Sequence, residues 1–182
     1  MGISMVTLLV ALGLQYRQQS TPIERDGPRQ SKNEPDFYLT NTSSIQYSIH
    51  GAPRSLFKAD KLEHFPEGDY TLASAPDVTL FHKDGTPWHI NALMGRIESD
   101  HKAIKLWNNV ELRRVTPESP LLMKTKELII EPDQKTAFTD QDVVITSNLG
   151  RVDATGMKTY FDENRMELLS NVRVRHEPIK PH

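Results

Sequence analysis

Apolar and polar residues alternate over short stretches of this chain, and the alternation recurs along most of its length. Trp88, Ile90 and Ala92 occupy every second position, which places them on one face of a β-strand. Turn-forming Asp, Glu, Asn and Pro residues interrupt the stretches at intervals of roughly 8–12 positions. The spacing of an amphipathic helix is not found in these stretches. The pattern therefore predicts an all-β domain of many short antiparallel strands.

The alternating stretches belong to a repeated unit. Its anchors Ala59, Ala92, Thr125 and Ala154 lie 33, 33 and 29 residues apart. A Val preceded by Asn or Asp follows each anchor by 18 or 19 positions, and we interpret this Asn or Asp as a break between two short strands. Because one unit cannot bury its apolar face alone, the repeats are expected to stack into one sheet pair or roll.

The segments outside the repeats differ in composition. Residues 1–16 carry no charged side chain, and as a helix they would span roughly 24 Å, against about 30 Å for a bilayer core. We predict a membrane anchor here. The alternatives are a removed signal peptide, with Ala11 and Gly13 at its cleavage site, and a buried core segment. The rest of the predicted organisation is a polar, flexible linker at residues 17–36, a β domain at residues 37–176 and a polar tail at residues 177–182.

Charge and composition exclude several functions. The chain has 22 basic and 24 acidic residues, without the clustered basic excess of a nucleic-acid-binding protein. It has no cysteine, which excludes disulfides, thiol nucleophiles and Cys-ligated metals. The seven histidines are scattered, and neither a Gly-rich phosphate loop nor a G-x-S-x-G motif occurs. We therefore expect no enzymatic activity and no bound metal or cofactor.

Three short motifs carry a resemblance to a known family. They are FKADKL at Phe57–Leu62, NNVEL at Asn108–Leu112 and SNVRV at Ser170–Val174. In their order and spacing, after an apolar segment and a polar linker, the chain resembles the LptC family of lipopolysaccharide export proteins. The resemblance implies an OstA-like β-jellyroll in the periplasm, held by one N-terminal helix in the inner membrane of a Gram-negative bacterium. The N-terminal segment departs from that pattern, because it is short and lacks a basic flank.

The resemblance also implies the partners. The protein would receive lipopolysaccharide from the inner-membrane ABC transporter, formed by LptB, LptF and LptG, and pass it to the periplasmic bridge protein LptA for delivery to the outer membrane. This chain has no nucleotide-binding motif, so the energy would come from the partner ATPase.

The interior face of the roll is the first candidate site. The resemblance implies that acyl chains contact this face, whereas an ordinary dry core is the alternative, since small rolls usually fill with their own side chains. The candidate lipid-contacting residues are Phe57, Leu72, Val78, Leu80, Trp88, Ile90, Ile104, Leu106, Val110, Leu112, Met123, Ile129, Val143 and Ile145, and the same face is expected to include Met166, Leu168, Val172 and Val174.

The two end strands are the second candidate site. Unpaired strand edges are templates for pairing with another chain. The resemblance implies that the N-terminal edge faces the transporter and the C-terminal edge faces LptA. The edge candidates are Phe37, Leu39, Ile45, Tyr47, Ile49, Leu168, Val172, Arg173, Val174 and Arg175. The alternative role of Arg173 and Arg175 is to discourage pairing at the C-terminal edge.

Two other functions fit the same pattern. A secreted or periplasmic carbohydrate-binding β domain would need exposed aromatic platforms, for which Trp88, Trp107 and a few Tyr residues are available. A soluble, LptA-like bridge would result if the N-terminal segment is removed.

Overall fold

A computed structural model describes residues 34–82, 85–98, 103–114, 116 and 120–176. These residues form strands β1 (Phe37–Tyr47), β2 (Pro53–Phe65), β3 (Tyr70–Ser74), β4 (Asp77–Leu80), β5 (Trp88–Asn91), β6 (Met94–Glu98), β7 (Ile104–Arg114), β8 (Leu121–Glu131), β9 (Thr136–Ser147), β10 (Gly150–Tyr160) and β11 (Arg165–His176), with a single 3₁₀ turn, η1 (Phe161–Glu163), between β10 and β11. Every strand pairing is antiparallel. The prediction of an all-β domain is confirmed.

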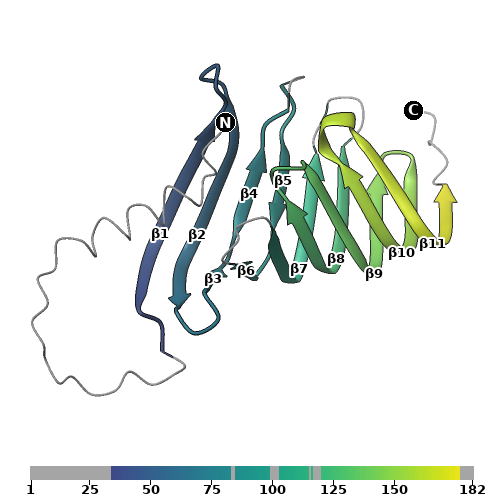
Figure 1. Cartoon of the computed structure of the whole chain (residues 1–182). Coiled ribbons are helices and arrows are strands. Elements are labelled where there is room, and N and C mark those ends of the chain that lie inside the picture. Colours follow the sequence, from purple (N-terminus) through teal and green to yellow (C-terminus); the bar gives the residue numbers. More distant parts are fainter. Residues whose placement is uncertain (1–33, 83–84, 99–102, 115, 117–119, 177–182) are drawn as a thin grey trace, which may run out of the picture.

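The strands lie side by side in nearly their chain order (Figure 1). One long strand, β2, pairs with β1 on one side and with both β4 and β3 on the other. The short pairs β4–β5 and β3–β6 fill the space between β2 and β7. From β7 onward each strand pairs with the next one in sequence. Among the described strands, β1 and β11 are therefore the two ends of the sheet.

The long strands bend near their middles. Asn41 in β1, Asn108 in β7 and Asn171 in β11 have φ angles of 51°, 63° and 52°, a left-handed conformation that Asn tolerates better than most other residues. The pairing register shifts at the same level in β7–β8 and β10–β11. The predicted break between short strands is therefore wrong. The Asn marks a bend within one strand of 11 residues in β7 and 12 in β11.

The bend folds the sheet into two halves, which we call the β4–β5 half and the β3–β6 half. Buried residues of both halves form one hydrophobic core. The free ends of the halves also meet. Trp88 of β5 packs edge-to-face against Phe161 of η1, with ring centroids 5.5 Å apart. The interior of the roll is thus the space between the two halves.

Small residues line the crease where the halves join. The repeat anchors Ala59, Ala92, Thr125 and Ala154 are all buried, with exposed fractions of 4%, 6%, 9% and 5%. In the register, Val143 lies opposite both Thr125 and Ala154. A larger side chain would push the halves apart here, because interiors are packed as densely as organic crystals. The sequence repeat therefore places one small residue at the crease on every second strand across the sheet.

The strands run from Phe37 to His176. The anchor expected at residues 1–16, most of the linker at residues 17–36 and the tail at residues 177–182 lie outside the described residues. In the part of the chain that is described, no helix has the length and apolar character needed to cross a bilayer.

Candidate functional site

One row of apolar side chains crosses the β4–β5 half from β2 to β11, and we call it the apolar ladder. Its members lie opposite one another on neighbouring strands, and they are Phe57, Val78, Ile90, Leu112, Met123, Ile145, Val152 and Val174. The exposed fraction is 9% or less from Phe57 to Ile145 and rises to 70% at Val174. At the other end, the residue opposite Phe57 on β1 is the polar Ser44. The ladder is therefore polar at the N-terminal edge and apolar and exposed at the C-terminal edge.

A second row faces the ladder from the β3–β6 half. It consists of Ile97, Ile104, Ile130, Ala137 and Thr159, which are in register across β6 to β10. Each is 6% exposed or less. The hydroxyl of Thr159 donates to the sulfur of a methionine in the same strand, at 3.6 Å, so this row also offers the interior an essentially apolar surface.

Most of the residues expected on the interior face are buried there. They are Phe57, Val78, Trp88, Ile90, Ile104, Leu106, Val110, Leu112, Met123, Val143 and Ile145. Leu80, Met166 and Leu168 are partly buried and pack against the same core. Whether any of these side chains contacts lipid stays a prediction.

The assignment of Leu72 to the interior is wrong. Its side chain lies on the outer face, opposite Glu63 and Arg96 on the neighbouring strands. Its neighbour Ala73 takes the interior position, with 1% exposed. The cause is the left-handed residue Ala75, φ 49°, which separates β3 from β4 and changes the phase of the alternation between them.

The assignment of Ile129 to the interior is also wrong. Its partner on β7 is Lys105, on the outer face, whereas Leu128 is fully buried. The pairing of β8 with β9 shifts register between Thr125 and Ile129, and a one-residue shift exchanges the two faces of a strand. Alternation extended from the first half of β8 therefore selects the wrong residue in the second.

Several interior residues do not follow from the alternation pattern. They are Leu62, Ala73, Ile97, Leu128, Ile130, Ala137, Met157 and Phe161. Most of them lie beyond a bend or a register shift, where the phase counted from the repeat anchor no longer holds. The run Leu128-Ile-Ile130 is apolar at every position, so it contains no signal of its own for the phase.

The N-terminal edge strand presents different residues on its two faces. Phe37 and Leu39 lie on the inner face of the β3–β6 half, opposite His64 and Leu62. Ile45 and Tyr47 lie on the outer face instead, 42% and 56% exposed. Ile49 does not belong to this strand, which ends at Tyr47, so its prediction as an edge-strand residue is wrong. It lies in the turn before β2 and is 81% exposed.

The C-terminal edge strand carries Leu168, Val172 and Val174 on the inner face, whereas Leu169 lies on the outer face and is 62% exposed. Leu168 packs against the core, but Val172 and Val174 are 49% and 70% exposed, because no described strand lies beyond β11. Val174 lies opposite Val152 of the apolar ladder, as expected for the inner face, but at this edge neither valine is buried. Arg173 and Arg175 lie on the outer face, opposite Asp153 and Arg151 of β10.

Charges gather on the outer face near this edge. Asp153 accepts a hydrogen bond from Arg151 at 2.6 Å, and the guanidinium of Arg175 is 3.9 Å away. The hydrogen bond from Arg151 holds the pKa of Asp153 below its usual range, and the charges of Arg175 and Arg173 act in the same direction. Three cations surround one carboxylate, so the outer face of the C-terminal edge has a net positive charge.

A second outer-face carboxylate is held by two cations. Glu111 of β7 accepts hydrogen bonds from Arg113 and pairs with Lys124 of β8 at 2.7 Å. These contacts, Arg113 first and then Lys124, hold the pKa of Glu111 below its usual range. The outer face is therefore charged and ion-paired where the inner face is apolar.

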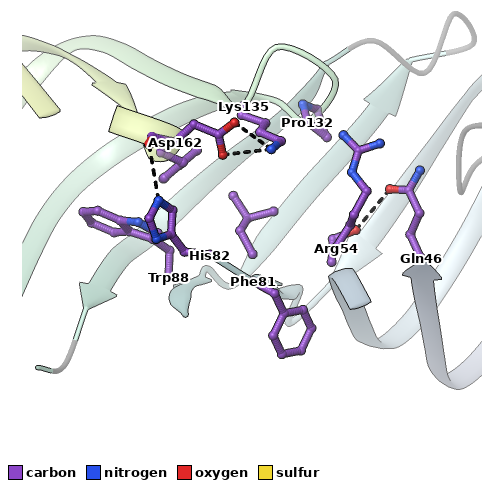
Figure 2. Close-up of a pocket in the computed structure, with 11 residues that line it drawn as sticks. Gln46, Arg54, Phe81, His82, Trp88, Pro132, Lys135 and Asp162 are labelled. Atoms are coloured by element: carbon purple, nitrogen blue, oxygen red, sulfur yellow. Dashed lines mark hydrogen bonds and ion pairs between the residues drawn. The ribbon is translucent and has the colours of Figure 1, made fainter. Parts of the chain in front are cut away.

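A small pocket opens where the free ends of the two halves meet (Figure 2). We call it the seam pocket, and its lining includes Gln46, Arg54, Leu80, Trp88, Lys135 and Asp162. Its volume is about 40 Å³, against roughly 300–1,000 Å³ for pockets that hold drug-sized ligands. The seam therefore has to open further before an acyl chain can pass between the halves.

One side of the seam is held together by η1. The carboxylate of Asp162 accepts two hydrogen bonds from Lys135 Nζ, at 2.7 and 2.8 Å. His82 Nε2 lies 3.3 Å from the carbonyl oxygen of Asp162 and joins the end of β4 to η1 (Figure 2). The Lys135 bonds fix η1 to the turn between β8 and β9 on the same half. The His82 contact and the Trp88–Phe161 contact cross from the β4–β5 half to η1 and close the seam.

Trp88 does not supply the aromatic platform that the carbohydrate-binding alternative needs, although Tyr38 and Tyr47 are 65% and 56% exposed. Trp88, the better placed of the two tryptophans for the seam, is only 3% exposed. A sugar platform needs an accessible ring face, and the ring of Trp88 is covered by Phe161 and by the guanidinium of Arg114, 5.2 Å from its centroid.

Comparisons with known proteins point to one family. The family model described as "Lipopolysaccharide-assembly, LptC-related" matches residues 3–177. Proteins named "Lipopolysaccharide export system protein LptC" from Escherichia coli strain K12, E. coli O157:H7 and Shigella flexneri are each 25% identical to this chain over 92 residues. These matches cover 50% of this chain and 48% of each relative, so the chain spans about half the length of the curated relatives it matches.

Proposed function

Since the chain belongs to the LptC-related family of lipopolysaccharide-assembly proteins, we propose that it is a non-enzymatic component of lipopolysaccharide export. The observation that carries this proposal is the apolar ladder, which crosses the roll from β2 to β11 without a charged residue. An acyl chain lying along the ladder would exchange water for apolar surface at each strand level, which is favourable in proportion to the area covered.

The two edges are proposed as the partner surfaces. In this proposal β1 pairs with the inner-membrane ABC transporter complex of LptB, LptF and LptG, and β11 pairs with the periplasmic bridge protein LptA. The exposed inner-face residues Val172 and Val174 support the second pairing. A strand added to β11 would cover them and extend the ladder into the next protein, while main-chain hydrogen bonds supplied affinity.

The location follows from the same proposal. Residues 1–16 would form a single-pass anchor in the inner membrane, and the β-jellyroll would lie in the periplasm. No cofactor is required, because the chain carries the lipid and the transporter supplies the energy.

Photo-crosslinking tests the interior as the lipid path. A diazirine-bearing amino acid is placed at Leu112 or Met123 on the ladder, and the matched controls carry it at Leu72 or Ile129 on the outer face. Lipopolysaccharide adducts are expected at the two ladder positions and not at the two controls. Equal adduct yields on both faces, or adducts at the controls alone, would contradict the proposal.

A further inference from the structure

The seam pocket contains two hydrogen-bond donors that lack an acceptor among the described residues. Trp88 is buried, with 3% of its surface exposed, and its Nε1–H has no hydrogen-bond partner. The guanidinium of Arg54 makes no ion pair or hydrogen bond within the described part of the chain. Buried polar groups are nearly always paired, so the orphaned indole N–H of Trp88 points to an acceptor that comes from outside the chain. Arg54 is half-buried and lines the same pocket, where its guanidinium can reach the same acceptor.

The charge of the pocket favours an anion. Its other lysine or arginine, Lys135, is neutralised by Asp162 at 2.7 Å. That carboxylate is also the acidic group of the described lining. Arg54 therefore leaves the seam pocket with one uncompensated positive charge.

The pocket adjoins the apolar interior. Leu80 and Trp88 lie opposite each other on β4 and β5, two residues along the strands from Val78 and Ile90, which lie opposite each other in the apolar ladder. A ligand with its polar group in the seam pocket can therefore extend an apolar chain directly along the ladder. The volume of about 40 Å³ leaves room for one small group, not for a whole lipid.

From these observations we propose that the seam pocket binds a phosphate group of the transported amphiphile, with Arg54 and Trp88 as its donors. A guanidinium presents paired N–H groups that match two phosphate oxygens, and the indole N–H supplies one further donor. The inference rests on the proposed function and adds a headgroup subsite to it. It assigns Arg54 the role of holding the lipid's anionic end at the seam while its chains lie between the halves.

The test compares two lipids and three variants of the full-length protein. Affinity is measured for lipid A carrying its phosphates and for dephosphorylated lipid A, with inorganic phosphate as a separate probe. Arg54→Gln removes the charge, and Trp88→Phe removes the N–H while keeping a ring against Phe161. Arg113→Gln, an outer-face change of the same charge, is the matched control. Urea midpoints show whether each variant remains folded.

The expected result is a preference of about tenfold for the phosphorylated lipid in the parent protein, as a charged hydrogen-bonded contact provides. Arg54→Gln should abolish this preference, Trp88→Phe should reduce it, and Arg113→Gln should leave it intact. A loss of folding alone would weaken binding of both lipids equally and would not change their ratio.

Other results overturn the subsite and separate it from the proposed function. If both lipids bind the parent equally, or if Arg54→Gln keeps the preference, the subsite is wrong while export function stands. If inorganic phosphate shifts the Trp88 indole N–H resonance but neither lipid discriminates, the pocket binds free phosphate and the headgroup assignment is wrong. If neither lipid binds the parent, both the subsite and the proposed function fail.

Discussion

Two neighbouring residues of β8 provide the sharpest test of how this chain is folded. Leu128 is fully buried between the halves, opposite Leu106 of β7. Ile129 is partly exposed on the outer face, opposite Lys105. Uniform alternation from Met123 and Thr125 places them the other way round. Replacing each with Ala therefore distinguishes the register shift in β8 from a regular strand.

The magnitudes follow from burial. Leu128→Ala removes three carbon atoms from the core, which costs roughly 2.4 kcal/mol in transfer free energy at about 0.8 kcal/mol per carbon. The cavity adds to this cost, so the total should lie in the range of about 2.5–5 kcal/mol seen for such truncations. Ile129→Ala leaves no enclosed cavity, since solvent and neighbouring side chains can fill the space. It loses about half of the transfer term, or about 1 kcal/mol.

Equilibrium urea unfolding of the full-length protein measures both costs. The dependence of the unfolding free energy on urea concentration should be the same for parent and variants, because each exposes nearly the same surface area on unfolding. Leu128→Ala should be at least about 1.5 kcal/mol less stable than Ile129→Ala, the difference between the two costs. Equal costs, or a larger cost at Ile129, would refute the register shift and with it the outer-face position of Ile129.

Three further measurements address the crease, the outer face and the C-terminal edge. Gly156 has φ +77°, and a Cβ there would lie 2.9 Å from Leu169 Cδ1, whereas at Gly51, φ +79°, it would meet nothing within 4 Å. In thermal unfolding, Gly156→Ala should therefore cost clearly more than Gly51→Ala, which carries only the left-handed strain of about 1 kcal/mol; equal costs would contradict the contact. The lowered pKa of Glu111 contributes stability above the unfolded-state pKa that is lost as the pH falls through the folded-state pKa. Urea midpoints should therefore show Glu111→Gln less stable than the parent near neutral pH and closer to it in acid, and a gap that widens in acid would show the opposite sign. Arg173→Pro removes one main-chain N–H from β11 and should weaken LptA capture strongly, while Arg173→Ala should weaken it only mildly; a folded proline variant that captures LptA like the parent would exclude pairing at this strand.

The parts of the fold that could be predicted are those encoded by neighbouring residues. Alternation within one half-strand identifies the ladder residues Ile90, Leu112 and Met123, because a strand turns its side chains by half a turn at each residue. The repeat anchors such as Ala92 are readable for a similar reason. The crease requires a small residue on every second strand across the sheet, and that requirement produces the periodic spacing of the anchors in the sequence.

The parts that could not be predicted depend on distant contacts. Leu72 changes face because of a left-handed residue after β3, and Ile129 changes face because of a register shift in β8. Neither irregularity is marked by a distinctive residue type in the sequence. The seam pocket joins Arg54 of β2 to Asp162 of η1, more than a hundred positions apart in the chain. A lone Arg and a lone Trp have no sequence signature as a pair, so only the closure of the two halves reveals them.

The two ends of the roll differ in a way that gives the proposed transfer a direction. On β1 the inner face of the β4–β5 half carries Ser44 and Gln46, opposite Phe57 and Ser55. On β11 the same face carries Val172 and Val174, both substantially exposed. A strand added at β11 would bury apolar surface as well as pairing its main chain, whereas a strand added at β1 would gain mainly the main-chain bonds in this half. An acyl chain moving along the ladder would likewise meet polar groups at β1 and apolar ones at β11. Lipid bound between the halves is therefore favoured to continue past β11 rather than to return past β1.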